Sequence, residues 1–371
     1  MSKIYCARLI PLNGFFFGGE RNFVTDGEKN YLVQSRKFPQ QTTLLGMLRQ
    51  EILIQQGVSK MEEGKQSESA KEWAKLIGPK SFQLNPNKQK QAFGWIRALS
   101  PAYMFREDHL YQILPKDDGL EFQTRKKIKV DLGFGIKSVP LLKKLNPKHE
   151  LAEAYQSVDQ LIPFHGDSTN GEQGVWIASQ SIGIHKRYEG GTFDDAFFKQ
   201  TSFWPNGKEA GFQFYVKMKE EAQLNSNIVY MGGERSAFQM EVEEVSFPQF
   251  DPFIAWEVDR PARKNEVLRV VLQAHSFVNP DELYPLCQHV FGQTISFRSL
   301  ETNLFKTKSY NRVAFSKDNP SGARTRSALY HLLEKGSVLY VQQPHLASVK
   351  RALSHPQFIQ IGYNYCQINL A

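Results

Sequence analysis

The order of strand and helix patterns in the last third of the chain constrains its fold more than any other feature. From residue 266 onward the pattern predicts strand, helix, strand, strand, helix and strand, at residues 266–274, 280–290, 294–300, 326–341, 346–353 and 358–369. Asn279 and Pro280 fit the start of the first helix, as N-cap and first-turn proline. Lys335-Gly336 marks a turn within the long fourth element. This β-α-β-β-α-β order is the signature of the ferredoxin-like, or RRM-like, fold.

The first half of the chain follows the same order once its insertions are set aside. The predicted strands and helices lie at residues 3–12, 42–56, 94–105, 109–114, 175–186, 212–218, 219–230 and 237–245, of which 42–56 and, weakly, 219–230 are helices. Thr42 or Thr43 is the expected cap of the first helix, and Gly57 its stop. The polar residues 58–90 are typical of a surface insertion with a short helical piece.

A chain of 371 residues exceeds the usual size of a single hydrophobic core, which favours two domains. We therefore predict an α+β protein with two ferredoxin-like domains. Residues 1–250 form the first, with insertions at about 58–90 and 115–172, and residues 251–371 form the second. The segment 246–265, rich in proline and acid, reads as the connection between them.

Charge is unevenly distributed along the chain. The formal net charge is +8, and residues 121–148 hold eight Lys or Arg against two acids, while residues 298–326 hold seven against two. Residues 241–259 hold six acids and no base. Basic patches attract phosphates, but many basic proteins bind no nucleic acid, so composition alone does not decide the function.

Several function classes find no support in the sequence. Cys6, Cys287 and Cys366 lie far apart with no Cys/His cluster, which argues against a structural zinc site and favours reduced thiols. The N-terminus has no signal-peptide pattern, and no stretch is long and apolar enough to span a membrane. We expect a cytoplasmic protein without a metal, cofactor or membrane partner.

Two glycine-rich loops share the letters Gly-Glu-Arg. One is Gly232-Gly233-Glu-Arg235-Ser236, and the other is Gly18-Gly19-Glu-Arg21, preceded by three phenylalanines. Glycine lets backbone N–H groups approach a phosphate closely, and arginine adds a charge-assisted hydrogen bond. The alternative is an ordinary tight turn in each case, with Phe15 to Phe17 packed in a core rather than stacked on bases.

The basic stretch 121–148 alternates charged and apolar residues, which predicts a projecting hairpin turning near Gly133 and Gly135. Arg125, Lys126 and Lys127 on such a hairpin would follow a phosphate backbone. A solvated charged surface explains the same residues equally well.

No catalytic constellation stands out. The nine histidines form no HxH or HxxxH pair. His185 with Lys186, Arg187 and Tyr188 has the residue types of a metal-free ribonuclease, but so do most exposed basic turns. The carboxylate pairs Asp117-Asp118 and Asp194-Asp195 fit solvated turns or helix caps better than a metal site. We therefore assign no catalytic residue and expect a protein that is not an enzyme.

An ordered set of motifs resembles the RAMP superfamily of CRISPR proteins, and its order and spacing fit best the third subunit of the type III-B (Cmr) effector. The resemblance spans nearly the whole chain. Ala237-Phe-Gln after Ser236 lacks the further glycine of that family's loop, and residues 58–90 have no counterpart. The motifs lie at residues 11–23, 38–49, 182–198, 232–236, 326–330, 335–340 and 361–363.

The resemblance implies a role in RNA binding and assembly. Such subunits hold the repeat-derived 5′ tag of the CRISPR RNA (crRNA), contact the large polymerase/cyclase subunit and the backbone RAMP subunit, and do not cleave RNA. Carried over to this chain, the candidate RNA contacts are Gly18, Gly19, Arg21, Gly232, Gly233, Arg235, Ser236, Arg125, Lys126 and Lys127. Two alternatives remain open: a RAMP-fold endoribonuclease that processes precursor crRNA, and the tag-binding subunit of a type III-A or III-D effector.

Overall fold

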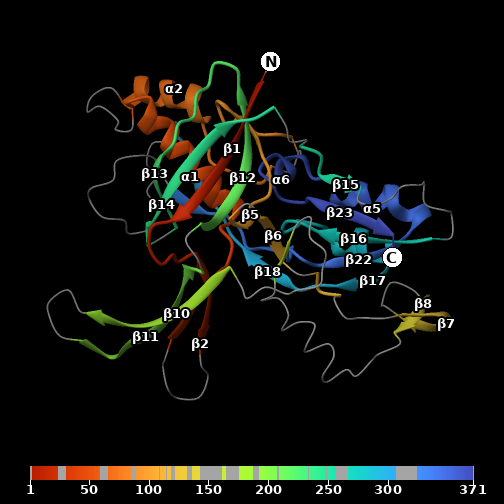
Figure 1. Cartoon of the computed structure of the whole chain (residues 1–371). Helices are drawn as coiled ribbons and strands as arrows, with labels where there is room; N and C mark the ends of the chain where they lie inside the picture. The colour runs from red at the N-terminus through yellow and green to blue at the C-terminus, as the bar shows by residue number, and fades with distance from the viewer. Residues whose placement is uncertain are drawn as a thin grey trace.

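A long first strand organises the N-terminal half. In the computed structural model, β1 (Ser2–Pro11) buries Tyr5, Ala7 and Leu9 on one face and pairs antiparallel on both edges. Its neighbours are β12 (Ala210–Lys219) and β14 (Ser236–Glu244), which come about two hundred residues later in the chain. β1 is therefore a central strand (Figure 1).

The structure describes most, but not all, of the chain. The described residues are 2–23, 31–58, 66–85, 89–107, 109–113, 115–117, 122–131, 136–142, 161–163, 175–186, 192–206, 209–232, 234–246, 250–255, 266–305 and 324–370.

The N-terminal sheet has eight strands. Its order is β13-β14-β1-β12-β5-β6-β9, with β4 (Ile96–Leu99) also pairing with β12. The remaining members are β13 (Asn227–Met231), β5 (Tyr103–Arg106), β6 (His109–Ile113) and β9 (Leu161–Pro163). Within it, β14, β1, β12 and β5 are successive neighbours, and of these four strands they come fourth, first, third and second along the chain.

The first helix forms nearly as predicted. α1 (Gln41–Gln55) buries one apolar stripe in the core, while Gly57, with a φ of 71°, follows its end. Its predicted cap is wrong, because the N-cap residue is Gln40 and no side chain caps the helix. The buried stripe comprises Leu44, Leu45, Leu48, Ile52 and Leu53.

Residues 66–85 are not a surface insertion, which corrects the expectation for this stretch. α2 (Gln66–Ile77) buries Trp73 and Ile77, and Phe82 beyond it is also buried in the same core. Arg49 donates from Nε to the carbonyl of Ile77, which fixes α2 against α1, and burial lowers the pKa of Arg49 to about 10. The polar composition reflects only the exposed face of α2.

The predicted weak helix at 219–230 is absent. A turn follows β12, and β13 then pairs antiparallel with β14 from Asn227 to Met231. The sheet thus gains a strand where the β-α-β-β-α-β order places its second helix.

The C-terminal half contains a five-stranded sheet of order β15-β23-β16-β22-β17. Among β23, β16, β22 and β17, the chain order is again fourth, first, third and second. Its strands are β15 (Phe253–Ala255), β16 (Val267–Leu272), β17 (Cys287–Phe291), β22 (Val338–Gln342) and β23 (Cys366–Leu370).

Several C-terminal elements differ from expectation. α5 (Leu346–Leu353) lies where predicted, and Asn279 accepts a hydrogen bond from the N–H of Asp281, as an N-cap does. The helix predicted at 280–290 stops early, because α4 (Pro280–Leu283) and the 3-10 turn Tyr284–Leu286 give way to β17. The last predicted strand begins instead as α6 (Pro356–Gln360).

The long element predicted at 326–341 is divided by turns. β20 (Arg324–Arg326) pairs with β19 (Leu300–Thr302), and β21 (Tyr330–Leu333) pairs with β18 (Thr294–Phe297). The predicted turn before β22 is confirmed, since Gly336 has a φ of 87°.

Two further strand groups lie outside these sheets. The first has the order β10-β11-β3-β2, and β10 and β11 extend away from the body of the molecule as an arm (Figure 1). The second is the hairpin β7 (Phe122–Asp131) and β8 (Ile136–Leu142), on the opposite side of the view. The first group consists of β2 (Gly18–Phe23), β3 (Tyr31–Ser35), β10 (Trp176–Lys186) and β11 (Thr192–Pro205).

The protein is therefore a mixed α/β structure built mostly of antiparallel strands, as the predicted class requires. In the described part of the chain, no helix is long and apolar enough to cross a membrane.

The two halves share one core. Phe297, Phe358 and Tyr363 belong to the same buried cluster as β1 and α1. The ring of Phe82 lies 5.2 Å from that of Phe358 in a T-shaped arrangement. The domain boundary near residue 250 stays a prediction, and the contact between the halves is extensive and apolar.

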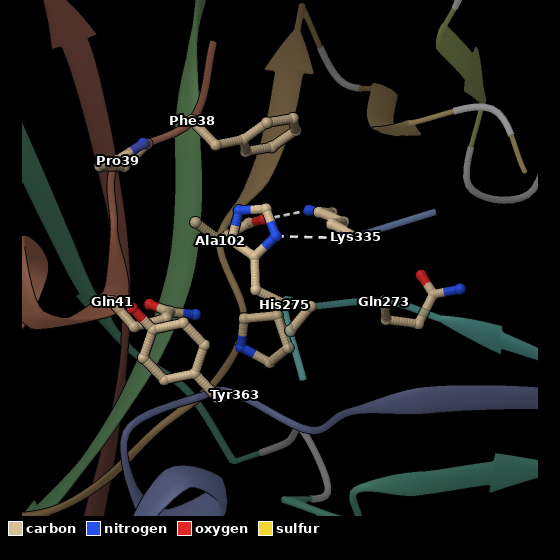
Figure 2. Close-up of a pocket in the computed structure, with 10 residues that line it drawn as sticks. Phe38, Pro39, Gln41, Ala102, Gln273, His275, Lys335 and Tyr363 are labelled. Carbon is tan, nitrogen blue, oxygen red and sulfur yellow. Dashed lines mark hydrogen bonds between the residues drawn. The ribbon is translucent and has the colours of Figure 1, made fainter. Parts of the chain in front are cut away.

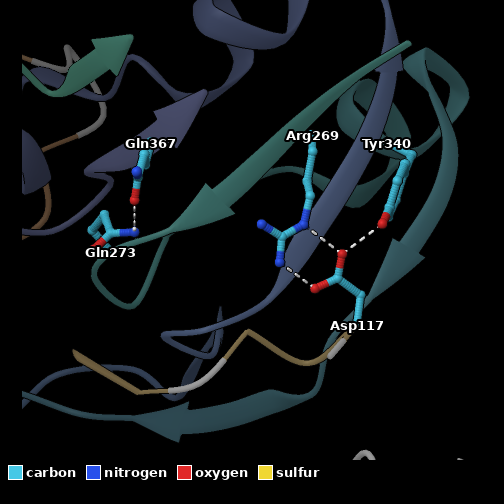
Figure 3. Close-up of polar contacts among 5 residues, drawn as sticks. All are labelled: Asp117, Arg269, Gln273, Tyr340 and Gln367. Carbon is cyan, nitrogen blue, oxygen red and sulfur yellow. Dashed lines mark hydrogen bonds and ion pairs between the residues drawn. The ribbon is translucent and has the colours of Figure 1, made fainter. Parts of the chain in front are cut away.

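A buried ion pair also joins the halves (Figure 3). Arg269 of β16 donates to Asp117 through Nε at 2.6 Å and through Nη2 at 2.5 Å, and the hydroxyl of Tyr340 donates to the same carboxylate at 2.6 Å. Asp117 is buried, so its expected place in a solvated turn is wrong. Three donors satisfy a carboxylate that would otherwise be costly to bury.

Replacing Asp117 with alanine is expected to lower the free energy of unfolding by about 3 kcal/mol, because Arg269 and Tyr340 would lose their shared acceptor. Urea denaturation measures this. The control is Glu244→Ala, which breaks the exposed Lys3–Glu244 pair, 3.8 Å apart, and should cost less than about 1 kcal/mol. A loss for Asp117→Ala no larger than the control's would show that the pair does not stabilise the fold.

Candidate nucleic-acid interface

The strip Gly14–Gly18 lies between β11 and the glycine-rich turn that precedes β14. Its last residue, Gly18, begins β2, so the segment predicted as the first glycine-rich loop is a strand. On one side, the N–H of Phe15 donates to the carbonyl of Phe203 at 2.8 Å, and the N–H of Phe203 donates back at 3.0 Å. On the other side, the N–H of Phe16 donates to Oγ of Ser236 at 3.0 Å. Gly232 and Ser236 therefore lie against Phe16, which comes two residues before Gly18, the first residue of β2.

Phe15, Phe16 and Phe17 are all buried. The core interpretation is therefore confirmed for these three rings, and none is free to stack on a base. The packing fixes the strip in place, because each side chain that points inward belongs to the core of the eight-stranded sheet.

The loop after β13 depends on glycine at position 232. Gly232 has a φ of 76°, and a Cβ on it would lie 2.8 Å from the carbonyl oxygen of Phe16. Any side chain would push the loop off the strip. The N–H of Arg235 donates to the Gly232 carbonyl at 3.2 Å and closes the turn, with Arg235 itself at a φ of 52°. The tight-turn alternative is thus correct for the backbone, and it leaves room for a ligand at the exposed face of the turn.

Arg235 is exposed and held over an aromatic ring. Its guanidinium carbon lies 5.4 Å from the centre of the Tyr230 ring, and Tyr230 is itself 54% exposed. This cation–π contact orients the charge without neutralising it. Tyr230 was not among the residues predicted from the sequence, because residues 219–230 were expected to form a helix rather than the strand β13.

Of the other predicted residues, three lie in a strand and one is outside the described part of the chain. Gly18, Gly19 and Arg21 lie in β2, where Arg21 pairs in register with Val33 of β3. Gly233 lies outside the described residues.

The basic hairpin does not join this site. The strand β7 that contains Arg125, Lys126 and Lys127 pairs antiparallel with β8, as predicted, while the turn with Gly133 and Gly135 lies outside the described residues. β8 lies beside β17 of the C-terminal sheet, and Figure 1 shows the hairpin far from the strip. Any RNA contact made there would be separate from the loops.

The residues considered for catalysis or metal binding are not brought together by the fold. His185 lies in β10, while Asp194 and Asp195 lie in β11. Among the described residues no group of three or more His, Cys, Asp or Glu is placed to hold a metal ion. Cys287 and Cys366 are buried free thiols.

A small cavity lies between the two halves (Figure 2). Its free space is about 20 Å³, roughly that of a single water molecule. Nζ of buried Lys335 donates to the carbonyl of Ala102 at 2.7 Å and lies 3.9 Å from the centre of the Phe38 ring, while the backbone N–H of Lys335 donates to Nδ1 of His275 at 3.0 Å. The cavity is too small for a nucleotide.

Burial changes the protonation of both residues. It lowers the pKa of Lys335 to about 7 and that of His275 to about 3, where neighbouring Arg36, Lys335 and Lys116 add a smaller effect. Neutral His275 accepts the Lys335 N–H. The cavity is thus part of the contact between the halves.

Comparison with known proteins identifies the family. The sequence model of the family described as CRISPR-associated protein (Cas_Cmr3) matches residues 7–369. The chain belongs to this family. The resemblance predicted from the order of its motifs is confirmed.

Solved structures give two similar chains. One comes from a cryo-EM structure of the type III-B Cmr-beta bound to cognate target RNA, with 12% identity, 99% of each chain covered and a TM-score of 0.46. The other, from the same assembly bound to cognate target RNA and AMPPnP, has 12% identity, 98% of each chain covered and a TM-score of 0.44. None of the curated proteins matches.

The free energy of unfolding of this Cas_Cmr3 protein is expected to depend on pH through Lys335. The unfolded chain holds a proton on this lysine up to pH 10.5 and the folded chain only up to about pH 7, so this group destabilises the fold below pH 7 and less so as the pH rises above 7. Wild type should therefore gain about 3 kcal/mol of stability from pH 6 to pH 9 that Lys335→Met does not gain.

Urea denaturation at the two pH values measures that change. The control is Lys71→Met, on the exposed face of α2. Its free energy of unfolding should differ from that of wild type by the same amount at pH 6 and at pH 9. A constant difference between Lys335→Met and wild type would mean that Lys335 keeps its proton throughout, held by the Phe38 ring.

Proposed function

We propose that this chain is a non-catalytic crRNA-binding and assembly subunit of a type III-B Cmr complex. It holds the repeat-derived 5′ tag of the crRNA, and it docks on the large polymerase/cyclase subunit and the backbone RAMP subunit. Membership of the Cas_Cmr3 family supports the CRISPR context. The observation that carries the RNA-binding role is the contact of the turn holding Gly232, Arg235 and Ser236 with Phe16, two residues before the Gly-Gly-Glu-Arg segment of β2.

The chemistry of this turn and of the neighbouring segment of β2 suits a phosphate. Gly232 is exposed and carries no side chain of its own, and Gly233 follows it in sequence. Arg235 brings a cation whose position is set by Tyr230, and Arg21 comes from the neighbouring strand β2. Backbone N–H groups and a guanidinium together bind phosphate oxygens while the bases remain free for partner surfaces.

The two halves are proposed to be ferredoxin-like domains. Both sheets contain four strands in fourth, first, third, second order, which supports this assignment. In the N-terminal half β13 replaces the second helix, and in the C-terminal half the first helix shrinks to one short turn.

Burial removes two histidines from the candidates for the general base of a ribonuclease, while His185, the candidate from the sequence, lies in β10. His275 and His355 are buried, and His275 is neutral above about pH 3. A general base must reach the proton that it abstracts, and these two imidazoles do not.

Binding of tagged and tag-less crRNA tests the proposal. The purified chain, alone and together with the large subunit, is titrated with both RNAs by fluorescence anisotropy. Tighter binding of the tagged RNA supports tag capture. Equal binding of the two RNAs, with no association with the large subunit, would refute it.

Arg235→Ala is expected to weaken crRNA binding and to reduce the slope of log K against log salt by about 0.7, the value for one phosphate contact on a single strand. Arg235→Lys should keep most of the slope. The control is Arg351→Ala, at an exposed position of α5 in the other half, which should leave both quantities unchanged. An unchanged slope in Arg235→Ala would mean that Arg235 serves only to close the turn over Tyr230.

A further inference from the structure

Trp204 presents an exposed indole at the root of the β10–β11 arm. It follows buried Phe203 in β11, so it points to the opposite face of the strand, and it is 45% exposed. Its cross-strand partner Ile177 is 53% exposed. Large apolar side chains that stay this exposed next to each other mark contact sites more often than chance.

The absence of a side chain at Gly14 leaves the space that the Trp204 ring occupies. A Cβ on Gly14 would lie 2.6 Å from both Cε2 and Nε1 of Trp204, so the ring lies directly over the Gly14 backbone. One face of the indole is thus covered by backbone, and the remaining exposed surface is available to a flat partner. Such a ring, fixed from below, loses little conformational freedom when something stacks on it.

The surface beside the indole is neutral and polar. Cross-strand register places Ser179 and Ser181 of β10, and Gln200 and Ser202 of β11, on the same face as Trp204. The strand surface next to the indole thus carries hydroxyl and amide groups at these four positions, rather than carboxylates or a broad apolar patch. Groups of this kind hydrogen-bond to ribose, phosphate and base edges.

The indole and the glycine-rich turn before β14 flank the same short strip. Phe15 bonds to Phe203, next to Trp204, and Phe16 bonds to Ser236 of the loop. Neighbouring strands lie about 4.8 Å apart, so about 10 Å separates the two features. One single strand of RNA reaches both.

From this geometry we propose that Trp204 is a stacking platform for an unpaired base of the RNA that the glycine-rich turn holds. The inference rests on the proposed function and adds a residue to its site. An aromatic face is tolerant of base identity, so the platform positions the RNA without reading its sequence. A docking site for a partner protein is the competing explanation, and an apolar side chain of another shape would serve it equally well.

Three substitutions separate these explanations, with fluorescent crRNA as the probe and the full chain, alone and with its partner subunits, as the protein. Trp204→Ala and Trp204→Leu should weaken RNA binding by about 5- to 100-fold with an unchanged salt slope, since no charge is lost. Trp204→Phe should retain most of the affinity. Phe305→Ala removes an exposed aromatic ring in the C-terminal half and is the matched control, expected to have no effect.

Other outcomes overturn the platform. Wild-type affinity in Trp204→Ala overturns it while leaving tag binding intact, and so does loss of partner binding in Trp204→Ala that Trp204→Leu restores. No RNA binding by the wild type, alone or with its partners, overturns the proposed function and the platform together. Thermal melting of each variant shows whether Trp204 only shields Gly14, in which case the midpoint falls and RNA affinity stays unchanged.

Discussion

The burial of Phe15 is the constraint on which the candidate interface depends. Its side chain has no exposed surface, and its ring lies within about 6 Å of five other aromatic rings. Such a ring cannot move without opening the core, so the backbone on either side of it is fixed. The Gly232 turn on one side and the Trp204 indole on the other both take their positions from this residue. The five rings are those of Phe17, Trp176, Phe203, Phe212 and Phe238.

Close approach, rather than flexibility, explains the glycines that matter here. Gly232 and Gly14 each lie against a neighbour that a Cβ would strike, a carbonyl in one case and an indole in the other. Long-range contact also joins the two halves at the ion pair. Asp117 comes from the first half and Arg269 from the second, so the pair forms only when the halves are packed together. The interface is therefore a property of the whole chain, and a fragment containing only the glycine loops would lack the packing that positions them.

Sequence patterns predicted the elements whose periodicity is local. The stripe of α1, the extent of α5 and the cap at Asn279 follow from neighbours within one or two turns. The wrong predictions have one cause, which is strand pairing with residues far away in the sequence. Residues 287–291 add to the edge of a sheet beside β22, and residues 227–231 pair with β14, although neither run is distinguishable from a short helix by pattern alone. Likewise, the glycine-rich segments were visible as motifs, whereas the contact of the Gly232 turn with Phe16 required the long-range pairing of β1 with β14.

The most basic segment of the chain does not lie at the proposed RNA site. The strongest basic run lies on the β7–β8 hairpin beside the C-terminal sheet, while β14, next to the glycine loop, ends in exposed Glu241, Glu243 and Glu244. Among the described residues of the glycine-rich turn Arg235 is the single cation, so stacking on Trp204 is proposed to add to charge neutralisation there. A site of that kind binds weakly on its own and gains from neighbouring surfaces that supply further contacts to the same strand. The arrangement suits a subunit that fixes one end of an RNA within a larger assembly better than one that captures RNA alone.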